Sequence, residues 1–335
     1  MNMIPITILG CGAWGGTIAQ VLAKEGHSIT SWGKSSEKID QLNSTRKHPN
    51  ISGLQFSESI SFTYDINKAL DHTQIIIIAV PSQTVRKLIR QIKSLVSGEV
   101  IIVNLSKGIE NSSLMTMSQV IHDEGNFDPQ NIISLYGPSH AEEVALGMPT
   151  TLVAAGPSDD HTALIQQVFS SENLRVYTNS DILGVELGGS VKNVIAIAAG
   201  IIDGIGFGDN TKAALITRGI TEITRLGKEM GANPDTFSGL SGIGDLIVTC
   251  LSKHSRNRFV GEEIGKGRKL SDILKDMTMI AEGIETTKSV YELHKKHTIS
   301  MPITKVVYNV LYFGKNPTKA IKELMERDLT IEKRY

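Results

Sequence analysis

The sequence has 335 residues, of which 40% are hydrophobic and 21% are charged, and its formal net charge is -1. This length predicts two domains, and the near-neutral charge argues against nucleic acid or an anionic membrane as the main partner. Two cysteines are too few for a disulfide framework or a metal cluster, so no metal is expected. The N-terminus lacks a signal-peptide pattern, and the longest apolar runs are too short to span a bilayer. We therefore expect a cytoplasmic protein without membrane insertion.

A glycine-rich turn follows the first predicted strand, Ile4–Leu9, and precedes a predicted helix, Thr17–Lys24. The turn fits the pattern G-x-G-x-x-G with Gly10, Gly12 and Gly15. In such a turn the first glycine makes the sharp bend, the second lets the backbone approach a pyrophosphate, and the third lets helix and strand pack closely. The start of the helix then offers N–H groups to the phosphates. The pattern predicts a dinucleotide-binding site.

The residues after the second predicted strand, Ser28–Trp32, bear on the choice of cofactor. An NAD site usually places a carboxylate there to bind the ribose 2′-hydroxyl. Here the sequence continues Gly33-Lys34-Ser35-Ser36, without a carboxylate before Glu37. Lys34 and the serines suit a 2′-phosphate, which favours NADP over NAD. Alternatively, Lys34 is an ordinary solvated lysine and either cofactor is accepted.

Alternating strands and helices continue to about residue 183, which predicts an α/β Rossmann-like domain over residues 1–183. The further predicted strands are Gln74–Val80, Glu99–Leu105, Ile132–Tyr136, Thr151–Ala155 and Leu174–Tyr177. Ligands of open α/β sheets bind at the carboxyl ends of strands, which makes Lys107 and Ser139 candidate site residues. For Lys107 a surface turn is the competing interpretation. His140 is a candidate general base, but no second histidine or suitably placed carboxylate near it in the sequence supports that role, so we interpret it as structural.

After Asp181 the pattern becomes helical, which predicts an all-α domain over residues 184–335. The predicted helices are Val185–Ile202, Lys212–Met230, Glu285–Lys296, Ile303–Phe313 and Thr318–Met325. The first of these carries many small residues, such as Gly188 and Gly200, which would let a second element approach its backbone. It also carries a single lysine, Lys192, whose pKa burial would lower into the range of a useful proton donor. The alternative is that Lys192 extends its ammonium to water.

Two clusters in the helical half carry polar chemistry. A glycine-rich turn, Gly239–Gly244, leads to Asp245, which shares a helix face with Thr249. The alternative role for Asp245 is a helix cap. Ser255, Arg256 and Asn257 form a donor-rich group suited to a phosphate monoester, or alternatively an ordinary helix start.

Together these segments resemble the NAD(P)-dependent glycerol-3-phosphate dehydrogenases of the bacterial type, over nearly the whole chain. The stretches that carry the resemblance are GCGAWGGTIA, NLSKGIE, YGPSHAEEVALGMPT, VELGGSVKNVIAIAAGIIDGIGFGDNTKAALITRG, GLSGIGDLIVTC and SRNR. The resemblance implies hydride exchange between NAD(P)H and C2 of dihydroxyacetone phosphate, which gives sn-glycerol 3-phosphate for phospholipid synthesis.

The resemblance also implies roles for individual residues. Lys192 would be the proton donor in reduction and the acceptor in oxidation. The substrate would contact Lys107, Gly137, Ser139, Asp245, Ser255, Arg256 and Asn257. The cofactor would contact the glycine-rich turn together with Ala13, Trp14, Lys34, Lys107, Ala141, Arg256, Ile280 and Glu282. Relatives often have serine at position 13 and arginine or histidine at position 34, so Ala13 lacks a hydroxyl and Lys34 keeps only the charge.

Two other functions compete with this interpretation. A β-hydroxyacid dehydrogenase also combines a glycine-rich turn with a catalytic lysine, but its carboxylate substrate fits the Ser255–Asn257 group less well. A cofactor-sensing binding protein would need none of Lys192, Asp245 and Arg256. The apolar helical half is compatible with a homodimer.

Overall fold

The computed structural model describes residues 3–96, 99–329 and 331–332. The chain forms two compact units, which we call the sheet unit and the helical unit. The sheet unit comprises Met1–Ser106 and Met117–Ile182, and the helical unit comprises Lys107–Thr116 and Leu183–Tyr335. The single boundary expected between residues 183 and 184 therefore leaves out one segment, Lys107–Thr116, which we call the arm.

The sheet unit is built on one eight-stranded sheet with the order β3-β2-β1-β4-β5-β6-β7-β8. The strands are β1 (Pro5–Leu9), β2 (Ser28–Trp32), β3 (Ile60–Thr63), β4 (Ile75–Ile78), β5 (Ile101–Asn104), β6 (Ile132–Tyr136), β7 (Thr150–Ala155) and β8 (Leu174–Asn179). The first six are parallel, whereas β7 is antiparallel to β6 and parallel to β8. Because the chain order reverses between β1 and β4, the carboxyl ends of these two strands form the switch point at which such sheets bind ligands.

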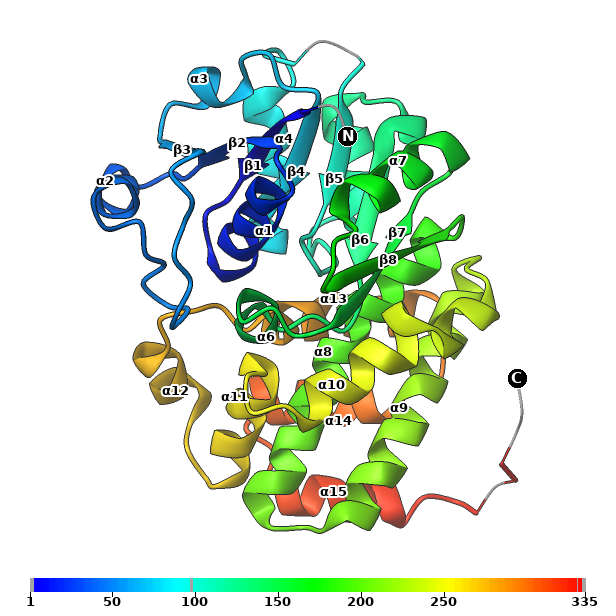
Figure 1. The fold of residues 1–335 in the computed structure, drawn as a ribbon. Coiled ribbons are helices and arrows are strands. Elements are labelled where there is room, and N and C mark those ends of the chain that lie inside the picture. Colours follow the sequence, from blue (N-terminus) through cyan, green and yellow to red (C-terminus); the bar gives the residue numbers. More distant parts are fainter. Residues whose placement is uncertain (1–2, 97–98, 330, 333–335) are drawn as a thin grey trace. The chain divides into compact units, whose positions relative to one another are not determined.

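Helices cover the sheet, and Figure 1 shows α1 and α7 in front of it. The helices of this unit are α1 (Ala13–Lys24), α2 (Ser36–Thr45), α3 (Ile66–Leu70), α4 (Val85–Ile92), α5 (Met117–Gly125), α6 (Ala141–Ala145) and α7 (Asp159–Phe169), with 3₁₀ turns at Ser82–Thr84 and Pro129–Asn131. The central strand β4 consists of four isoleucines, all fully buried or nearly so. A parallel strand covered on both faces requires such a composition.

The α/β architecture predicted from the sequence is confirmed, with two differences in detail. The edge strand β3 is absent from the prediction, because four residues with only Ile60 and Phe62 as large apolar side chains give a weak signal. The reversed direction of β7 leaves no mark in its own sequence, because buried strands have the same composition in either direction.

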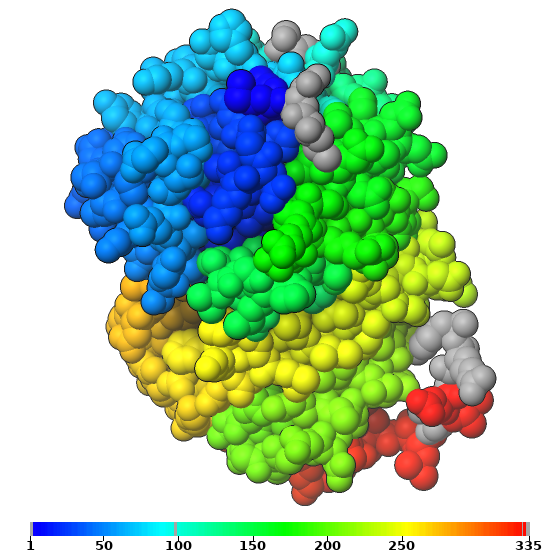
Figure 2. All heavy atoms as spheres, viewed as in Figure 1, coloured from blue at the N-terminus to red at the C-terminus, as the bar shows by residue number. Residues whose placement is uncertain are grey.

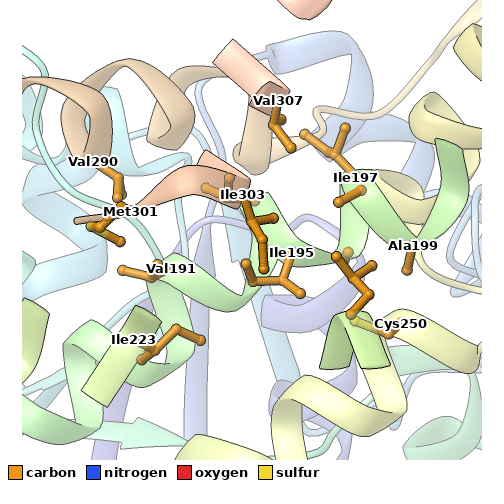
Figure 3. Packing of buried hydrophobic residues seen from close by; sticks show 14 of the residues in the cluster. Val191, Ile195, Ile197, Ala199, Ile223, Cys250, Val290, Met301, Ile303 and Val307 are labelled. Atoms are coloured by element: carbon orange, nitrogen blue, oxygen red, sulfur yellow. The ribbon is translucent and has the colours of Figure 1, made fainter. Parts of the chain in front are cut away.

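The helical unit is organised around α8 (Ile182–Ile205), whose residues from Gly184 to Ile202 are all buried. The other helices are α9 (Asp209–Glu229), α10 (Asp245–Leu251), α11 (Arg256–Gly265), α12 (Leu270–Asp276), α13 (Glu282–Lys296), α14 (Pro302–Phe313) and α15 (Pro317–Met325). Figure 3 shows the packing of Val191 and Ile195 of α8 among side chains of its neighbours. α8 is long and apolar enough to cross a membrane, but 94% of its apolar window is buried inside the structure, so its composition suits a core helix.

The small residues of α8 allow the close approach that the sequence predicts. A Cβ atom on Gly200 would lie 1.9 Å from the Arg258 carbonyl oxygen, and one on Gly261 would lie 2.0 Å from the Ile197 carbonyl oxygen. The backbones of α8 and α11 are therefore in direct contact, and a larger residue at either position would force the helices apart.

The arm is folded into the helical unit rather than lying across a surface. Ile109 is fully buried in the helical core, and it forms an isolated bridge with Thr116 that closes the arm into a loop. The end of the chain differs, because Met325 and Leu329 are exposed at the surface, where Figure 2 shows the red C-terminal segment.

Candidate active site

The chemistry of the helical unit centres on the ammonium of Lys192. Its Nζ donates hydrogen bonds to Asp245 Oδ1 and, at 2.7 Å, to Thr249 Oγ1. The other carboxylate oxygen of Asp245 accepts a hydrogen bond of 2.6 Å from Lys107 Nζ. One carboxylate thus links two lysines that come from α8 and from the arm.

Burial sets the proton affinity of this group. Lys192 is 5% exposed and Asp245 is 1% exposed, so the side chain of Lys192 is almost entirely withdrawn from water. Burial lowers the pKa of Lys192 to about 7, because desolvation outweighs the attraction of Asp245 and the positive charge of Lys107 adds to the lowering. An ammonium with this pKa gains and loses its proton near neutral pH.

The glycine-rich turn positions Asp245. The residues Leu240–Gly244 form a π-helical turn, a conformation frequent at functional sites, and α10 begins directly after it. A Cβ atom on Gly188 would lie 2.7 Å from the Ser241 carbonyl oxygen, so glycine on α8 lets this turn lie against the helix. Gly188 is one helical turn before Lys192, which brings α10 within reach of its ammonium. Gly244, not Asp245, precedes α10 as its cap, and the cap interpretation of Asp245 is wrong.

Thr249 belongs to this group, although the sequence alone predicts no role for it. Its hydroxyl donates to the Asp245 carbonyl oxygen at 2.6 Å, which leaves its lone pairs free to accept from Lys192. The spacing of four residues from Asp245 was the available signal, because it places both side chains on one helix face.

The Ser255–Asn257 group divides into two bonded residues and one exposed cation. Ser255 caps α11 by accepting from the Arg258 backbone N–H at 3.2 Å. Asn257 donates to Asn193 Oδ1 at 2.9 Å and accepts from the Gly283 N–H at 2.9 Å. Arg256 is exposed, and within the described part of the chain its side chain makes no hydrogen bond or ion pair.

The bond from Asn257 to Gly283 also locates two predicted cofactor residues. It joins the start of α11 to the start of α13, where Glu282 is the first helical residue. Ile280, two residues earlier, is 53% exposed. Ile280 thus lies just before α13 and Glu282 at its start, and the bond from Asn257 to Gly283 brings this start close to the Ser255–Asn257 group.

The glycine-rich turn of the sheet unit has the geometry that dinucleotide binding requires. Gly10 has φ of 120°, and a Cβ atom there would lie 2.4 Å from the Ala79 carbonyl oxygen at the end of β4. A Cβ atom on Gly15 would lie 1.9 Å from the Gly10 carbonyl oxygen, which shows how closely α1 packs on the turn. Gly12 precedes α1 and has open space around its Cα. The turn is therefore tight where helix and strand meet and open where a pyrophosphate would approach, so its residues fit a dinucleotide.

Three residues that the sequence predicts to contact the cofactor lie in this turn or beside the helix that follows it. Ala13 and Trp14 are the first residues of α1, at the end of the helix that carries free N–H groups. Ala141 begins α6, and its carbonyl oxygen accepts a 3.5 Å hydrogen bond from Thr17 of α1. α6 therefore packs beside the helix that follows the turn.

At the end of β2 the structure leaves no room for a side chain on Gly33. A Cβ atom there would lie 2.4 Å from Cys11 Sγ and 3.0 Å from Ile39 Cδ1. Lys34 is exposed and directly precedes Ser35, which caps α2 by accepting from the Lys38 N–H at 3.3 Å.

Gly137 and Ser139 lie in the loop after β6. Gly137 has φ of 151°, and a Cβ atom there would lie 2.8 Å from the Thr151 carbonyl oxygen. Ser139 donates to the Gly137 carbonyl oxygen at 3.0 Å. The loop is thus tightly turned at the carboxyl end of β6, and His140 ends it as the residue before α6.

The comparison of sequences identifies the family. The profile of the N-terminal part of NAD-dependent glycerol-3-phosphate dehydrogenase matches residues 5–162, and that of its C-terminal part matches residues 181–322. The chain belongs to the NAD-dependent glycerol-3-phosphate dehydrogenase family. It is therefore an NAD(P)-dependent oxidoreductase, and the resemblance inferred from the sequence is confirmed.

Individual relatives of this dehydrogenase match over nearly their full length. A glycerol-3-phosphate dehydrogenase [NAD(P)+] of Chlorobium luteolum is 50% identical over 96% of this chain and 98% of the relative. One from Salinibacter ruber is 49% identical over 96% of this chain and 94% of the relative. The crystal structure of the Coxiella burnetii enzyme superposes with a TM-score of 0.93 at 35% identity, covering 97% of this chain and 99% of that chain.

A hydroxyacid dehydrogenase resembles this dehydrogenase in its fold. The structure of a D-mandelate dehydrogenase with NADH and anilino(oxo)acetate matches with a TM-score of 0.64 at 14% identity, over 95% of this chain and 100% of that chain. The family assignment therefore replaces both alternatives that the sequence left open, the β-hydroxyacid dehydrogenase and the cofactor sensor.

Proposed function

We propose that this chain interconverts dihydroxyacetone phosphate and sn-glycerol 3-phosphate with Lys192 as the proton donor and acceptor. The observation that carries the proposal is the bonding of the buried Lys192 ammonium. A protonated lysine has three N–H donors, and Asp245 and Thr249 take two of them. Two fixed acceptors orient the third N–H, which remains for a carbonyl oxygen of the substrate.

The nicotinamide cofactor, when bound, supplies or accepts the hydride at C2 of the substrate. During reduction negative charge develops on the carbonyl oxygen, and a positioned ammonium both stabilises that charge and transfers a proton to it. In oxidation the neutral amine of Lys192 accepts the hydroxyl proton. A pKa of about 7 makes both forms available at neutral pH.

The substrate phosphate is assigned to the start of α11. Arg256 is exposed and makes no side-chain bond to any other described residue, and it stands at the N-terminal end of a ten-residue helix, where backbone N–H groups and the helix dipole attract an anion. Ser255 and Asn257 can each add one donor, because the serine proton and the second amide N–H are not used by the bonds described above. Lys107, 18% exposed at its side chain, is the second cation proposed to contact substrate and cofactor.

We further propose that the enzyme favours NADP over NAD. The position directly after β2 cannot hold a carboxylate to bind a 2′-hydroxyl, because Cys11 and Ile39 fill the space beside Gly33. Lys34 and the N-terminus of the ten-residue α2 offer positive charge to a 2′-phosphate instead.

The first test replaces Lys192 by alanine. Loss of the proton donor should lower kcat for dihydroxyacetone phosphate reduction by about 10²–10⁴-fold. The dissociation constant of NADPH, measured by the fluorescence of the reduced nicotinamide, should change little. Lys305→Ala, which removes an exposed lysine from α14, is the matched control and should leave kcat unchanged. A Lys192→Ala enzyme with the kcat of the parent would refute the role.

The second test addresses the cofactor preference. Lys34→Ala should weaken NADPH binding by about tenfold and leave NADH binding nearly unchanged, because only NADPH carries the 2′-phosphate. Fluorescence titration gives the dissociation constants of NADPH and NADH for parent and variant. The variant-to-parent ratio is then compared between the two cofactors. An equal loss of binding affinity for NADPH and NADH would contradict a contact between Lys34 and the 2′-phosphate.

Several expectations from the sequence stay predictions. They are the substrate contacts of Gly137 and Ser139, the cofactor contacts of Ala141, Ile280 and Glu282, the homodimer and the cytoplasmic location. The place of the product in phospholipid synthesis also belongs here, and it agrees with the family because sn-glycerol 3-phosphate is the backbone of these lipids.

A further inference from the structure

Along the chain, the sheet unit precedes and follows the arm. The backbone of the arm is nevertheless bonded to side chains of two helices of the helical unit, α8 and α13. Ser190 of α8 donates from Oγ to the Gly108 carbonyl oxygen at 3.2 Å. Ser289 of α13 donates from Oγ to the Ile109 carbonyl oxygen at 2.9 Å. These two carbonyls belong to the residues that directly follow Lys107.

Both serines are inside the protein. Ser190 is 0% exposed and Ser289 is 1% exposed, and Ile109 beside them is fully buried. A buried carbonyl without a donor costs about 1–3 kcal/mol, so irregular backbone enters a core where other groups, such as side-chain hydroxyls, supply donors. Ser190 and Ser289 therefore help this stretch of the arm to lie inside the helical unit.

The outer half of the arm has its own attachments. Asn111 donates from Nδ2 to Glu285 Oε2 of α13 at 2.6 Å, and its Oδ1 lies within hydrogen-bond distance of Ser289 Oγ. The Glu110 N–H donates to the Met115 carbonyl oxygen at 2.9 Å, which closes the loop. Side chains of α13 therefore hold the arm at Ile109, through Ser289, and at Asn111, through Glu285.

We propose that Ser190 and Ser289 are positioning residues for the dehydrogenase reaction, which hold the arm so that Lys107 shares the carboxylate of Asp245 with Lys192. This inference rests on the proposed role of Lys192. Neither serine touches the reacting atoms, and each acts on Lys107 through the arm backbone.

The position of Lys107 matters because of charge. Among the described residues, the ionisable groups that act most strongly on Lys192 are Asp245 and the Cys250 thiol, both on α10, and Lys107 on the arm. Burial raises the pKa of Cys250 to about 12, so this thiol is neutral at pH 7. The opposing influences are then Asp245, which raises the pKa of Lys192, and Lys107, which lowers it. If the arm loosens and Lys107 withdraws, the pKa of Lys192 must rise.

The test compares two variants that each remove a buried hydroxyl from α13. Ser289→Ala removes the donor to the arm. Thr287→Val removes a fully buried hydroxyl whose hydrogen bond in the described part of the chain stays within α13, to the Gly283 carbonyl oxygen at 2.6 Å, and it is the matched control. Lys107→Met, which removes the charge itself, sets the limit of the effect.

The readout is the pKa of Lys192 in the free enzyme, measured as the pH dependence of its acetylation by acetic anhydride with mass spectrometry. We expect Lys107→Met to raise this pKa by about one unit and Ser289→Ala to raise it by a part of that amount. Thr287→Val should leave it unchanged. The pH dependence of kcat should shift in the same direction.

An unchanged pKa of Lys192 in a folded Ser289→Ala enzyme would overturn the inference, and so would an unchanged pKa in Lys107→Met. If Ser289→Ala does not fold, Asn111→Ala loosens the arm from its outer half and is judged by the same criterion. Failure of the proposed function is distinguishable, because it appears as normal turnover of Lys192→Ala, whereas acetylation of the free enzyme needs no turnover.

Discussion

At the scale of the residue, Lys192 shows how a common side chain becomes a proton donor. Desolvation alone would drive its pKa far down, and a carboxylate alone would hold the proton too firmly. Asp245 is shared with Lys107, so the attraction it exerts on Lys192 is partly offset by a second cation. Removing one member of such a buried set costs about 3–5 kcal/mol, because the remaining charges lose their partner.

The residue-scale prediction concerns Asp245→Asn. Reduction needs protonated Lys192, so kcat of the parent should fall as the pH rises through about 7. Because the negative charge of Asp245 raises the pKa of Lys192, its removal should lower that pKa and shift the fall of kcat to lower pH. The measurement is kcat for dihydroxyacetone phosphate reduction between pH 5 and 9. A fall of kcat that shifts to higher pH in Asp245→Asn would contradict the assignment of this fall to the deprotonation of Lys192.

At the scale of the element, a helix can be capped by a residue far away in the sequence. The residue before α14, Met301, supplies no side-chain cap. Glu222 of α9, which is 2% exposed, accepts from the Ile303 N–H at 2.6 Å and from the Thr304 N–H at 3.2 Å. A carboxylate at a helix N-terminus is favourable, but this one lies in the core.

The element-scale prediction follows from that burial, which raises the pKa of Glu222 from 4.5 to about 7. Between these two pH values the folded protein holds a proton that the unfolded chain has lost. The free energy of unfolding should therefore fall with rising pH in this window, by up to about 1.4 kcal/mol for each pH unit. Glu222→Gln, which cannot ionise, should lack this contribution. Urea unfolding at pH 5, 6 and 7 gives the free energy of unfolding of parent and variant. If this free energy changes with pH by the same amount in both, the contribution of Glu222 is disproved.

At the scale of the whole molecule, the arm makes the two units interdependent in sequence. The helical unit takes Lys107–Thr116 from the middle of the sheet unit's chain, together with the buried side chain of Ile109. No cut at a single peptide bond can separate the units without leaving one of them incomplete.

The prediction at this scale concerns a fragment of residues 184–335. Without the arm, the carbonyl partners of Ser190 and Ser289 and the packing of Ile109 are missing. The fragment should therefore unfold at a lower temperature and less cooperatively than the helical unit of the full chain, as followed by circular dichroism. Addition of a peptide with residues 105–118 should raise its midpoint. A fragment as stable as the full chain would show that the arm contributes nothing to the fold.

Local patterns in the sequence were sufficient for much of this protein. The glycine-rich turn, the central apolar strands and the helix around Lys192 follow from short-range chemistry, since a turn or a helix face is defined by residues a few positions apart. The family itself followed from such stretches in order. The candidate residues for proton transfer and phosphate binding were also identifiable, because their residue types match the chemistry.

Only the tertiary structure decided how these residues are bonded. Asp245 meets Lys192 across 53 positions and Lys107 across 138 positions, and Ser289 meets the arm across 180. The sequence left open whether Lys192 reached water, whether Asp245 capped a helix, and which of Ser255, Arg256 and Asn257 stayed uncommitted. Burial, charge and hydrogen bonding depend on distances in space, and packing sets those distances for residues that no local pattern connects.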